Sequence, residues 1–330
     1  MDENQTLISI RGKQTKVPLI QIGDINVISS GKWLRVASVK DEDYCEEEPV
    51  TDPQRLIKQF KDKGGRADIF SFMQRIPGVS PRYNYPMQWD NAAAIPLANY
   101  SEWWNSLSQD TRRNVRLAAK RGAVVQGVQF SDDLIRGIAG IYNEAPFRQG
   151  RRFWHYGKDF ETVKRENSSY IERSQFIGAY CGSELIGFIK MVYVGKLACI
   201  MQILSKSSHQ DKGPTNALIA KAVEICAERG VSHLVYCKYV YHKNYQDALT
   251  EFKRRNRFQQ INFPRYFVPL TLKGRLAIRL NLQLGLAEML PPGIVAALLK
   301  ARSKYYESKG QEKIGDKVMM AACVKDPGSA

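Results

Sequence analysis

Residues 197–239, LACIMQILSKSSHQDKGPTNALIAKAVEICAERGVSHLVYCKY, contain in order the patterns of a strand, a loop, a helix and a second strand. The apolar run 197–204 has the length and flanks of a buried strand. Pro214 suits the first position of a helix, where its missing N–H is not needed, and Gly230 suits the residue after its end. Residues 231–240 supply the next strand. A crossover of this length predicts parallel strands with a right-handed connection.

The polar loop 205–214 is the best candidate site in the chain. In the predicted unit it lies at the carboxyl end of a strand and at the amino end of a helix. Unpaired backbone N–H groups and the helix dipole favour an anion at such a place. We therefore expect a phosphate or carboxylate group to bind there.

The elements around this unit predict an α/β (α+β) fold with one mixed sheet flanked by helices. After residue 123 the order is β, α, α, β, β, β, α, β, α, β, and ligands are expected where parallel strands separate. The predicted strands are 123–130, 175–180, 185–194, 197–204, 232–240 and 259–270, and the predicted helices are 131–143, 158–171, 214–229 and 245–256.

Four segments describe the expected domain organisation. Residues 1–100 contain several short β patterns and one helix, and predict a small lobe. Residues 101–122 predict a joining helix with a basic cluster, and residues 123–272 the main domain. Residues 273–330 have a helical period and basic side chains, so they predict a tail that packs on the body or lies on a membrane surface.

The composition is that of an ordinary globular protein, with 44% hydrophobic and 25% charged residues among 330. The formal net charge is +16, and residues 1–100 hold 13 basic and 13 acidic side chains, so the excess belongs to residues 101–330. A basic surface of this size either attracts anionic partners, such as nucleotides, acidic glycans, tRNA or lipid headgroups, or serves solubility alone.

Cysteine usage and the amino-terminal sequence favour a cytoplasmic protein. The six cysteines form no CxxC pair, and most fall within apolar patterns, which is typical of reduced core thiols. The acidic start of the chain lacks the features of a signal peptide, and no apolar run reaches the length of a membrane span. No spacing of His, Cys and Asp predicts a metal site.

Two motifs carry a resemblance to a known family. Residues 106–126, SLSQDTRRNVRLAAKRGAVVQ, are similar to the entry into the second lobe of Fem-type aminoacyl and peptidyl transferases and their acetyltransferase relatives. Residues 250–258, TEFKRRNRF, followed by PRYFVPL at 264–270, are similar to the ending of the same proteins. Together with the element order, they make the chain resemble the Fem-like branch of the GNAT acyltransferases, over residues 67–272. The resemblance implies that a smaller, degenerate GNAT-like lobe precedes the main one.

The resemblance also implies that an acyl group moves by direct attack from an activated donor to an amine. The donor would be acyl-CoA, or alternatively aminoacyl-tRNA. The CoA loop of GNAT enzymes matches here at Gln210 and Gly213, with Thr215 in place of a small residue. GNAT enzymes often protonate the leaving thiolate with a Tyr on the following helix. Phe252 stands at the nearest position here and cannot donate a proton, so its neighbours Tyr241 and Tyr245 are the candidates for that role. The expected donor-binding residues are Ile203, Leu204, Gln210, Lys212, Gly213, Thr215 and Asn216.

Residues 144–157, EAPFRQGRRFWHYG, are the candidate acceptor side, because they lie between the first two helices of the main domain. Glu144 and His155 have the chemistry of a general base for an ammonium group. Arg148 or Arg151 could bind an acidic acceptor. The alternative is an aromatic anchor that fixes a long loop with stacked Arg side chains. The expected substrate-binding residues are Arg148, Gln149, Arg151, Trp154, Tyr156, Arg113, Arg116 and Lys253.

These observations predict a cytoplasmic N-acyltransferase that acts on a small-molecule, glycan-linked or lipid-linked amine. The partners expected besides the acceptor are tRNA and, through the tail, a membrane surface. The alternative is a non-catalytic protein on the same fold that binds nucleic acid or an anionic surface through its positive charge.

Overall fold

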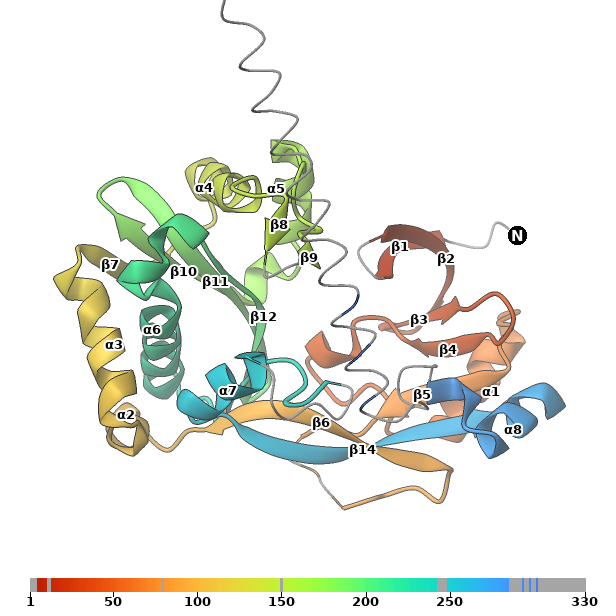
Figure 1. Cartoon of the computed structure of the whole chain (residues 1–330). Coiled ribbons are helices and arrows are strands. Elements are labelled where there is room, and N and C mark those ends of the chain that lie inside the picture. Colours follow the sequence, from red (N-terminus) through yellow and green to blue (C-terminus); the bar gives the residue numbers. More distant parts are fainter. Residues whose placement is uncertain are drawn as a thin grey trace, which may run out of the picture.

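A computed structural model describes residues 5–10, 13–76, 78, 80–148, 151–241 and 248–284, together with residues 293, 297 and 301. Twelve strands form one sheet in the order β1-β2-β3-β4-β5-β14-β6-β13-β12-β11-β10-β7. Most neighbours are antiparallel, and the pairs β4–β5 and β12–β13 are parallel. The sheet is therefore mixed, as predicted, and helices flank it in two lobes (Figure 1).

The main lobe has the predicted order of elements. Its strands and helices are β7 (Ala123–Val128), α4 (Asp132–Tyr142), α5 (Phe160–Asn167), β10 (Ser174–Cys181), β11 (Glu184–Val194), β12 (Leu197–Ser205), α6 (Pro214–Glu228), β13 (His233–Val235), α7 (Ala248–Arg255) and β14 (Gln259–Pro269). Between α4 and α5 lies a short hairpin, β8 (Phe147–Arg148) with β9 (Arg151–Arg152). β13 is much shorter than the predicted strand 232–240, and the predicted helix 158–171 ends earlier, before a 3-10 turn at Ile171–Arg173.

The first lobe is built from strands that pair antiparallel except for β4 with β5, one helix and a 3-10 turn. Its elements are β1 (Gln5–Ile10), β2 (Lys13–Ile22), β3 (Ile25–Ser30), β4 (Val36–Val39), the 3-10 turn η1 (Glu42–Tyr44), α1 (Pro53–Asp62), β5 (Ile69–Met73) and β6 (Met87–Pro96). Asp52 caps α1 by accepting from the Arg55 N–H, as its position before Pro53 predicts.

β14 joins the two lobes. Its residues 259–266 pair with β6, and its residues 265–269 pair with β5 of the first lobe. Figure 1 shows β14 and β6 running along the base of the molecule from one lobe to the other. The two lobes thus share a strand as well as a surface.

The faces of the main sheet have different covers. α6, with α2 (Tyr100–Ser106) and α3 (Gln109–Lys120), packs on the face that carries Ile189, Met191 and Ala198. α4 and α5 pack on the opposite face, where Phe176 and Phe188 are buried. This second face continues toward β13 and β6, where η1 of the first lobe approaches it. Because side chains alternate along each strand, one strand contributes side chains to the helices on both faces of the sheet.

α8 (Leu272–Arg279) follows β14 and packs on the first lobe, and the 3-10 turn η4 (Leu282–Leu284) follows it. The prediction of a helical tail over 273–330 lies largely outside the described residues. Within them, no helix combines the length and the apolar character that crossing a membrane requires.

Candidate active site

The parallel strands β12 and β13 separate soon after they meet. They pair at three positions, Leu197–Cys199 with His233–Val235, while β12 runs on to Ser205. The register of β12 against β11 also shifts at Met201, which is an extra residue between Ile200 and Gln202. Such a bulge increases the local twist. Beyond Cys199, within the described chain, the β13-facing edge of β12 has no strand beside it, which leaves a gap in the sheet at Ile203 and Leu204.

The loop after β12 ends at the amino terminus of α6. Residues 207–212 form a 3-10 turn, and Gly213 adopts the left-handed conformation with φ of 60°. α6 then starts at Pro214 without a side-chain cap, whereas α1, α2, α3, α4, α5 and α8 each have one. The first N–H groups of α6 therefore have no capping side chain, and the helix dipole makes this end attractive to an anion.

Glu144 holds this loop in place. Its carboxylate accepts hydrogen bonds from Ser207 N at 2.6 Å, Ser208 N at 2.8 Å and Ser208 Oγ at 2.7 Å, and it pairs with Arg148 at 3.0 Å. Burial raises the pKa of Glu144, but the hydrogen bonds from Ser208 and Ser207 outweigh burial and lower it overall. The carboxylate is thus ionised and occupied by the loop.

His155 belongs to a buried network behind the bulge of β12. Its Nε2 accepts from the Gln202 side-chain amide at 3.0 Å, and the Tyr142 hydroxyl donates to the other end of Gln202 at 2.7 Å. The rings of Tyr142, Phe153 and Trp154 pack against it. Burial, with Lys158 and Arg148 nearby, lowers the pKa of His155 to about 3. The imidazole is therefore neutral.

Arg148 is a structural brace between α4, β12 and the loop. It donates to the carbonyls of Ser205 at 2.8 Å and Ile141 at 2.6 Å, and its guanidinium lies 4.4 Å from the Phe153 ring centre. This arrangement resembles the aromatic anchor with a stacked Arg that the sequence leaves open. Trp154 and Tyr156 are about half exposed.

The residues predicted to bind the donor surround the gap but face different partners. Thr215 Oγ1 lies 3.1 Å from Ser205 Oγ, and Asn216 Oδ1 accepts from Asn256 at 3.1 Å. Gln210 is exposed, and Lys212 lies 4.0 Å from Asp211. Asn216 is thus occupied by a contact within the protein.

Other predicted site residues lie elsewhere or are not described. On α3, Arg113 is exposed, and the guanidinium of Arg116 lies 5.4 Å from the Trp104 ring centre. Gln149, Tyr245 and the Arg151 side chain lie outside the described residues. No group of three or more His, Cys, Asp or Glu within the described chain is placed to hold a metal ion.

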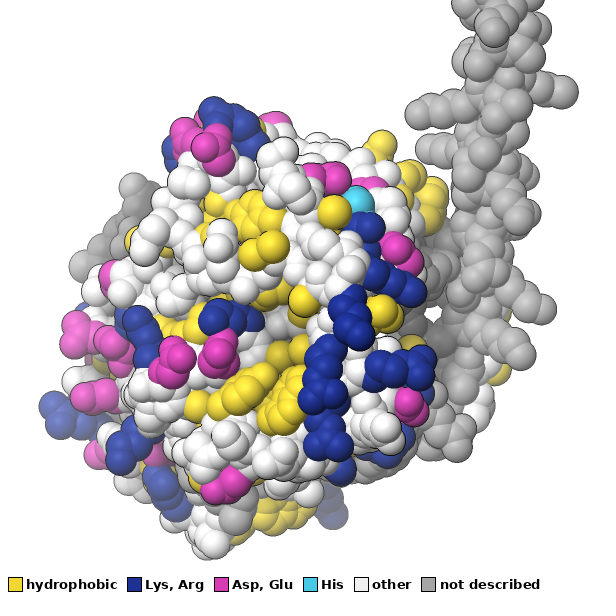
Figure 2. All heavy atoms as spheres, turned by 90° about the vertical axis from the view of Figure 1, so that its left-hand side faces the viewer, with side chains coloured by type: hydrophobic (Ala, Val, Ile, Leu, Met, Phe, Trp, Pro, Cys, Tyr) yellow, Lys and Arg dark blue, Asp and Glu magenta, His cyan; other side chains and the backbone are white. Residues whose placement is uncertain are grey.

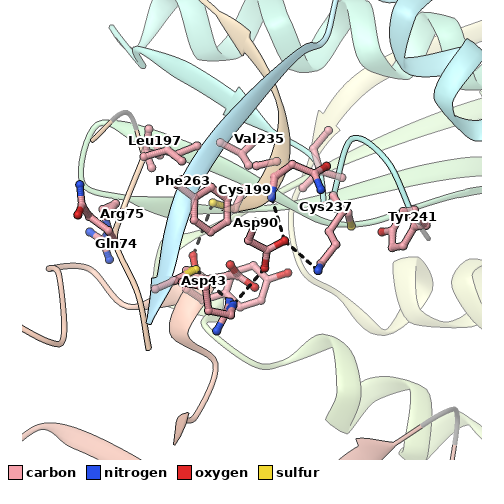
Figure 3. Close-up of a pocket in the computed structure, with 18 residues that line it drawn as sticks. Asp43, Gln74, Arg75, Asp90, Leu197, Cys199, Val235, Cys237, Tyr241 and Phe263 are labelled. Atoms are coloured by element: carbon pink, nitrogen blue, oxygen red, sulfur yellow. Dashed lines mark hydrogen bonds and ion pairs between the residues drawn. The ribbon is translucent and has the colours of Figure 1, made fainter. Parts of the chain in front are cut away.

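A cavity of about 330 Å³ lies on the second face of the sheet, between the two lobes. Figure 3 shows Asp43 and Asp90 near its centre, with Arg75 and Gln74 toward one end and Tyr241 toward the other. The walls come from η1, β5, β6, β12, β13 and β14, and they include the apolar residues Ile76, Val235 and Phe263. Cys199 and Val235, where β12 and β13 still pair, form its floor.

The two carboxylates of the cavity differ in their partners. Asp90 pairs with Lys238 at 2.8 Å and with Arg265 at 3.1 Å, and Arg265 also pairs with Glu42 at 3.2 Å. The Asp43 carboxylate makes no hydrogen bond or ion pair with any described residue. Burial raises the pKa of Asp43, against the influence of Arg265. The charges of Asp90, Lys238 and Arg265 lie around Asp43. A carboxylate that faces a cavity can bind an ammonium group or accept its proton.

Comparison with known proteins gives structural neighbours alone. No family model matches the sequence, and no curated protein matches it. FemX superimposes with a TM-score of 0.56 at 12% identity, over 79% of this chain and 89% of FemX. The C-terminal domain of a protein described as a lysylphosphatidylglycerol synthetase, from Agrobacterium fabrum, gives 0.51 at 11% identity, over 80% and 87%. L-PGS from Bacillus licheniformis gives 0.50 at 13% identity, over 80% and 88%.

This chain has the Fem-like GNAT fold. The fold predicted from residues 106–126 and 250–270 is confirmed. On the Fem-like GNAT fold of this chain, α6 starts at Pro214, as the sequence predicts. The gap between β12 and β13 begins earlier than the predicted strand 232–240 implies, because β13 ends at Val235.

Sequence reasoning did not find the cavity of this Fem-like GNAT fold. Asp43, Asp90 and Cys237 are far apart in the chain. The pairing of β6 with β13 brings Asp90 and Cys237 together, and η1, which packs on the same face, adds Asp43. The acidic loop 41–48 was a visible signal for Asp43, but nothing in it indicated a cavity. Lys253, predicted to bind substrate, lies buried beside this region, with its Nζ 5.0 Å from the ring centre of Tyr241.

Proposed function

We propose that this protein is an N-acyltransferase that moves an acetyl or aminoacyl group from an activated donor to an amine. The observation that carries the proposal is the opening of β12 from β13 at the uncapped start of α6, with a carboxylate-lined cavity on the other face of the same strands. The donor approaches along the opened edge, and the amine from the cavity. The Fem-like GNAT fold supports this class of reaction.

Acyl-CoA is the donor we favour, and aminoacyl-tRNA is the alternative. The phosphates of either donor would meet the first N–H groups of α6, where Gly213 allows close approach because it has no side chain. Gln210 and Lys212 are near enough in the chain to contribute. N–H groups on the free edge of β12, at Ile203 or Leu204, would stabilise the oxyanion that forms when the amine attacks the carbonyl carbon.

Asp43 is the group that we propose for the acceptor ammonium. The ammonium group must lose a proton before its nitrogen attacks, and the Asp43 carboxylate lines the cavity with no hydrogen bond or ion pair to a described residue. Glu144 and His155, expected from the sequence as bases, are better explained as supports. Glu144 fixes the donor loop, and neutral His155 orients Gln202 behind the bulge.

Donor binding and acyl transfer test the proposal in two steps. Calorimetric titration with acetyl-CoA, with a longer acyl-CoA and with aminoacyl-tRNA should give saturable binding of one donor. With that donor, mass spectrometry of a panel of primary amines should find an acylated product and an equal amount of released CoA or tRNA. Absence of both saturable binding and product with all donors would overturn the proposal.

The non-catalytic alternative rests on one surface. Figure 2 shows a band of Lys and Arg side chains on the face that carries α3, next to an apolar patch. The basic residues of α3 and its end are Arg112, Arg113, Arg116, Lys120 and Arg121. If this surface is the functional one, tRNA and unrelated RNA should bind equally well and lose affinity steeply as salt rises, without acyl transfer.

A further inference from the structure

Four large apolar side chains are exposed together at the far end of the first lobe. Leu272, Leu276 and Leu280 are 80%, 58% and 52% exposed, and Trp33 is 66% exposed. The three leucines are spaced by four residues, so they form one stripe along α8 and its end. In Figure 1, α8 lies at the edge of the first lobe, away from the main lobe.

The stripe is exposed because α8 is held firmly by its other side. Thr271 caps the helix and donates to Asp68 at 2.9 Å. A side chain at Gly274 would approach the Asp68 carbonyl oxygen to 1.9 Å, so the helix backbone lies directly against the backbone just before β5. Ala277 is buried in a cluster with Ile69 and Phe267. The leucines therefore point outward because α8 packs on the first lobe through its opposite side.

A basic depression of about 460 Å³ lies beside the stripe. Its cations come from three segments, the β3–β4 loop, the end of α1 with the following loop, and the start of α8. They are Lys32, Arg35, Lys61, Arg66 and Lys273. Lys273 lies 4.8 Å from the Trp33 ring centre and pairs with Asp68 at 3.7 Å. The other four cations form no ion pair with any described residue.

We propose that this Trp33–α8 surface, consisting of Trp33, the three leucines and the five cations, binds peripherally to a bilayer containing anionic phospholipid. Leucine side chains and a tryptophan ring are stabilised at the boundary of headgroups and acyl chains. The unpaired cations would meet lipid phosphates, which also attract clustered Lys and Arg over a distance. A nucleic acid would satisfy the cations but would leave the leucine stripe in water.

Vesicle flotation of the full chain tests the apolar part. Vesicles of phosphatidylcholine with about one-third phosphatidylglycerol should carry the protein, and pure phosphatidylcholine vesicles should carry much less. Trp33→Ala and Leu276→Gln should each reduce the partition coefficient about tenfold. Trp89→Ala and Leu7→Gln are matched controls, because both side chains are 56% exposed elsewhere, and they should bind like wild type.

A second pair of variants tests the charged part. Arg35→Gln with Arg66→Gln should reduce binding to the anionic vesicles about tenfold or more. Arg165→Gln with Lys196→Gln removes two exposed cations of the main lobe that have no ion pair with described residues, and should have little effect. Raised salt should weaken wild-type binding.

Two outcomes would overturn the inference. The first is that the full chain fails to float with anionic vesicles, as it would if residues after 284 or a second copy covered the stripe. The second is that the Trp33 and Leu276 variants float as well as wild type. Circular dichroism of each variant establishes that the fold is retained. Because no step measures acyl transfer, this test stands or fails independently of the proposed function.

Discussion

At the scale of single residues, the partners of a side chain decide its role more than its chemistry does. Glu144 and Asp43 are both carboxylates close to the opened strands. Glu144 accepts three hydrogen bonds from the loop before α6, while Asp43 lines the cavity without a hydrogen bond or ion pair to any described residue. The first is suited to fixing a loop, and the second to meeting a ligand.

Asp43→Asn should impair transfer without impairing donor binding. We expect kcat/KM for the amine to fall at least about tenfold, because the amide can neither pair with an ammonium group nor accept its proton. The donor dissociation constant should be unchanged. Glu46→Gln, an exposed change in the same acidic loop, is the control. Unchanged kinetics for Asp43→Asn would remove Asp43 from the mechanism.

Occupancy of the cavity can also be followed without turnover. Cys237 is exposed and lines the cavity, but burial around its sulfur raises the pKa of the thiol. Iodoacetamide should therefore alkylate it slowly at neutral pH and faster as the pH rises. An amine substrate should slow this alkylation in wild type but not in Asp43→Asn, as measured by peptide mass spectrometry. Because the pKa of Asp43 is raised, protection should weaken on acidification at a pH above the usual range for aspartate. Equal protection of both proteins would place the amine elsewhere.

His155 predicts a loss of stability in acid. Its pKa is lowered from 6.5 to about 3, so the folded state resists a proton that the unfolded chain accepts. Its contribution to stability is present above pH 6.5 and is lost as the pH falls toward 3. Between pH 7.5 and pH 5 this amounts to about 2 kcal/mol. Urea unfolding at pH 7.5 and pH 5 measures this loss. In His155→Phe the free energy of unfolding should decrease less between the two pH values than it does in wild type.

At the scale of elements, the loop before α6 is tied to the end of α4 through Glu144, which follows that helix. Glu144→Gln should weaken donor binding and lower the free energy of unfolding by about 2 kcal/mol, the usual cost for hydrogen bonds to a charged group. The turnover number at saturating donor should be largely retained. If donor affinity is unchanged and turnover is lost instead, Glu144 acts as the base. Calorimetry and steady-state kinetics on one preparation separate the two results.

Two helical glycines predict opposite effects of alanine. In α8, Gly274→Ala forces a methyl group against the Asp68 carbonyl. The free energy of unfolding should therefore fall by about 1–3 kcal/mol. In α4, Gly140 has its nearest neighbour at 4.0 Å, the Lys206 amine. Gly140→Ala should therefore stabilise the protein by about 0.5–1 kcal/mol. Thermal melts of both variants measure these changes. If α8 does not pack against Asp68, Gly274→Ala should stabilise the protein as Gly140→Ala does.

The order and type of the elements in the main lobe could be predicted from sequence because they rest on local patterns. Pro214, Gly213 and the apolar run before them define α6 and β12 without any distant contact. The short length of β13 could not be predicted. Its apolar run continues to Val240, but its pairing with β12 ends at Val235. The chain after Val235 still follows β6: Tyr236 N donates to the Ala93 carbonyl, Ala93 N donates to the Cys237 carbonyl, and Val240 N donates to the Asn91 side chain.

At the scale of the whole molecule, β14 predicts cooperative unfolding. The strand pairs with β6 and with β5, so the first lobe cannot separate without breaking hydrogen bonds of the main sheet. Urea unfolding followed by circular dichroism and by tryptophan fluorescence should give one transition with a single midpoint. Two separated transitions would show that the lobes are energetically independent.

The shared strand also limits how the protein could be divided. A chain cut near residue 106 would leave β5 and β6 with open edges, and the partner fragment would carry β14, the strand that fits both. Reassembly would then require one fragment to insert a strand into the other, which is a form of donor-strand complementation. We expect separately produced halves to aggregate when alone and to become soluble when they are expressed together.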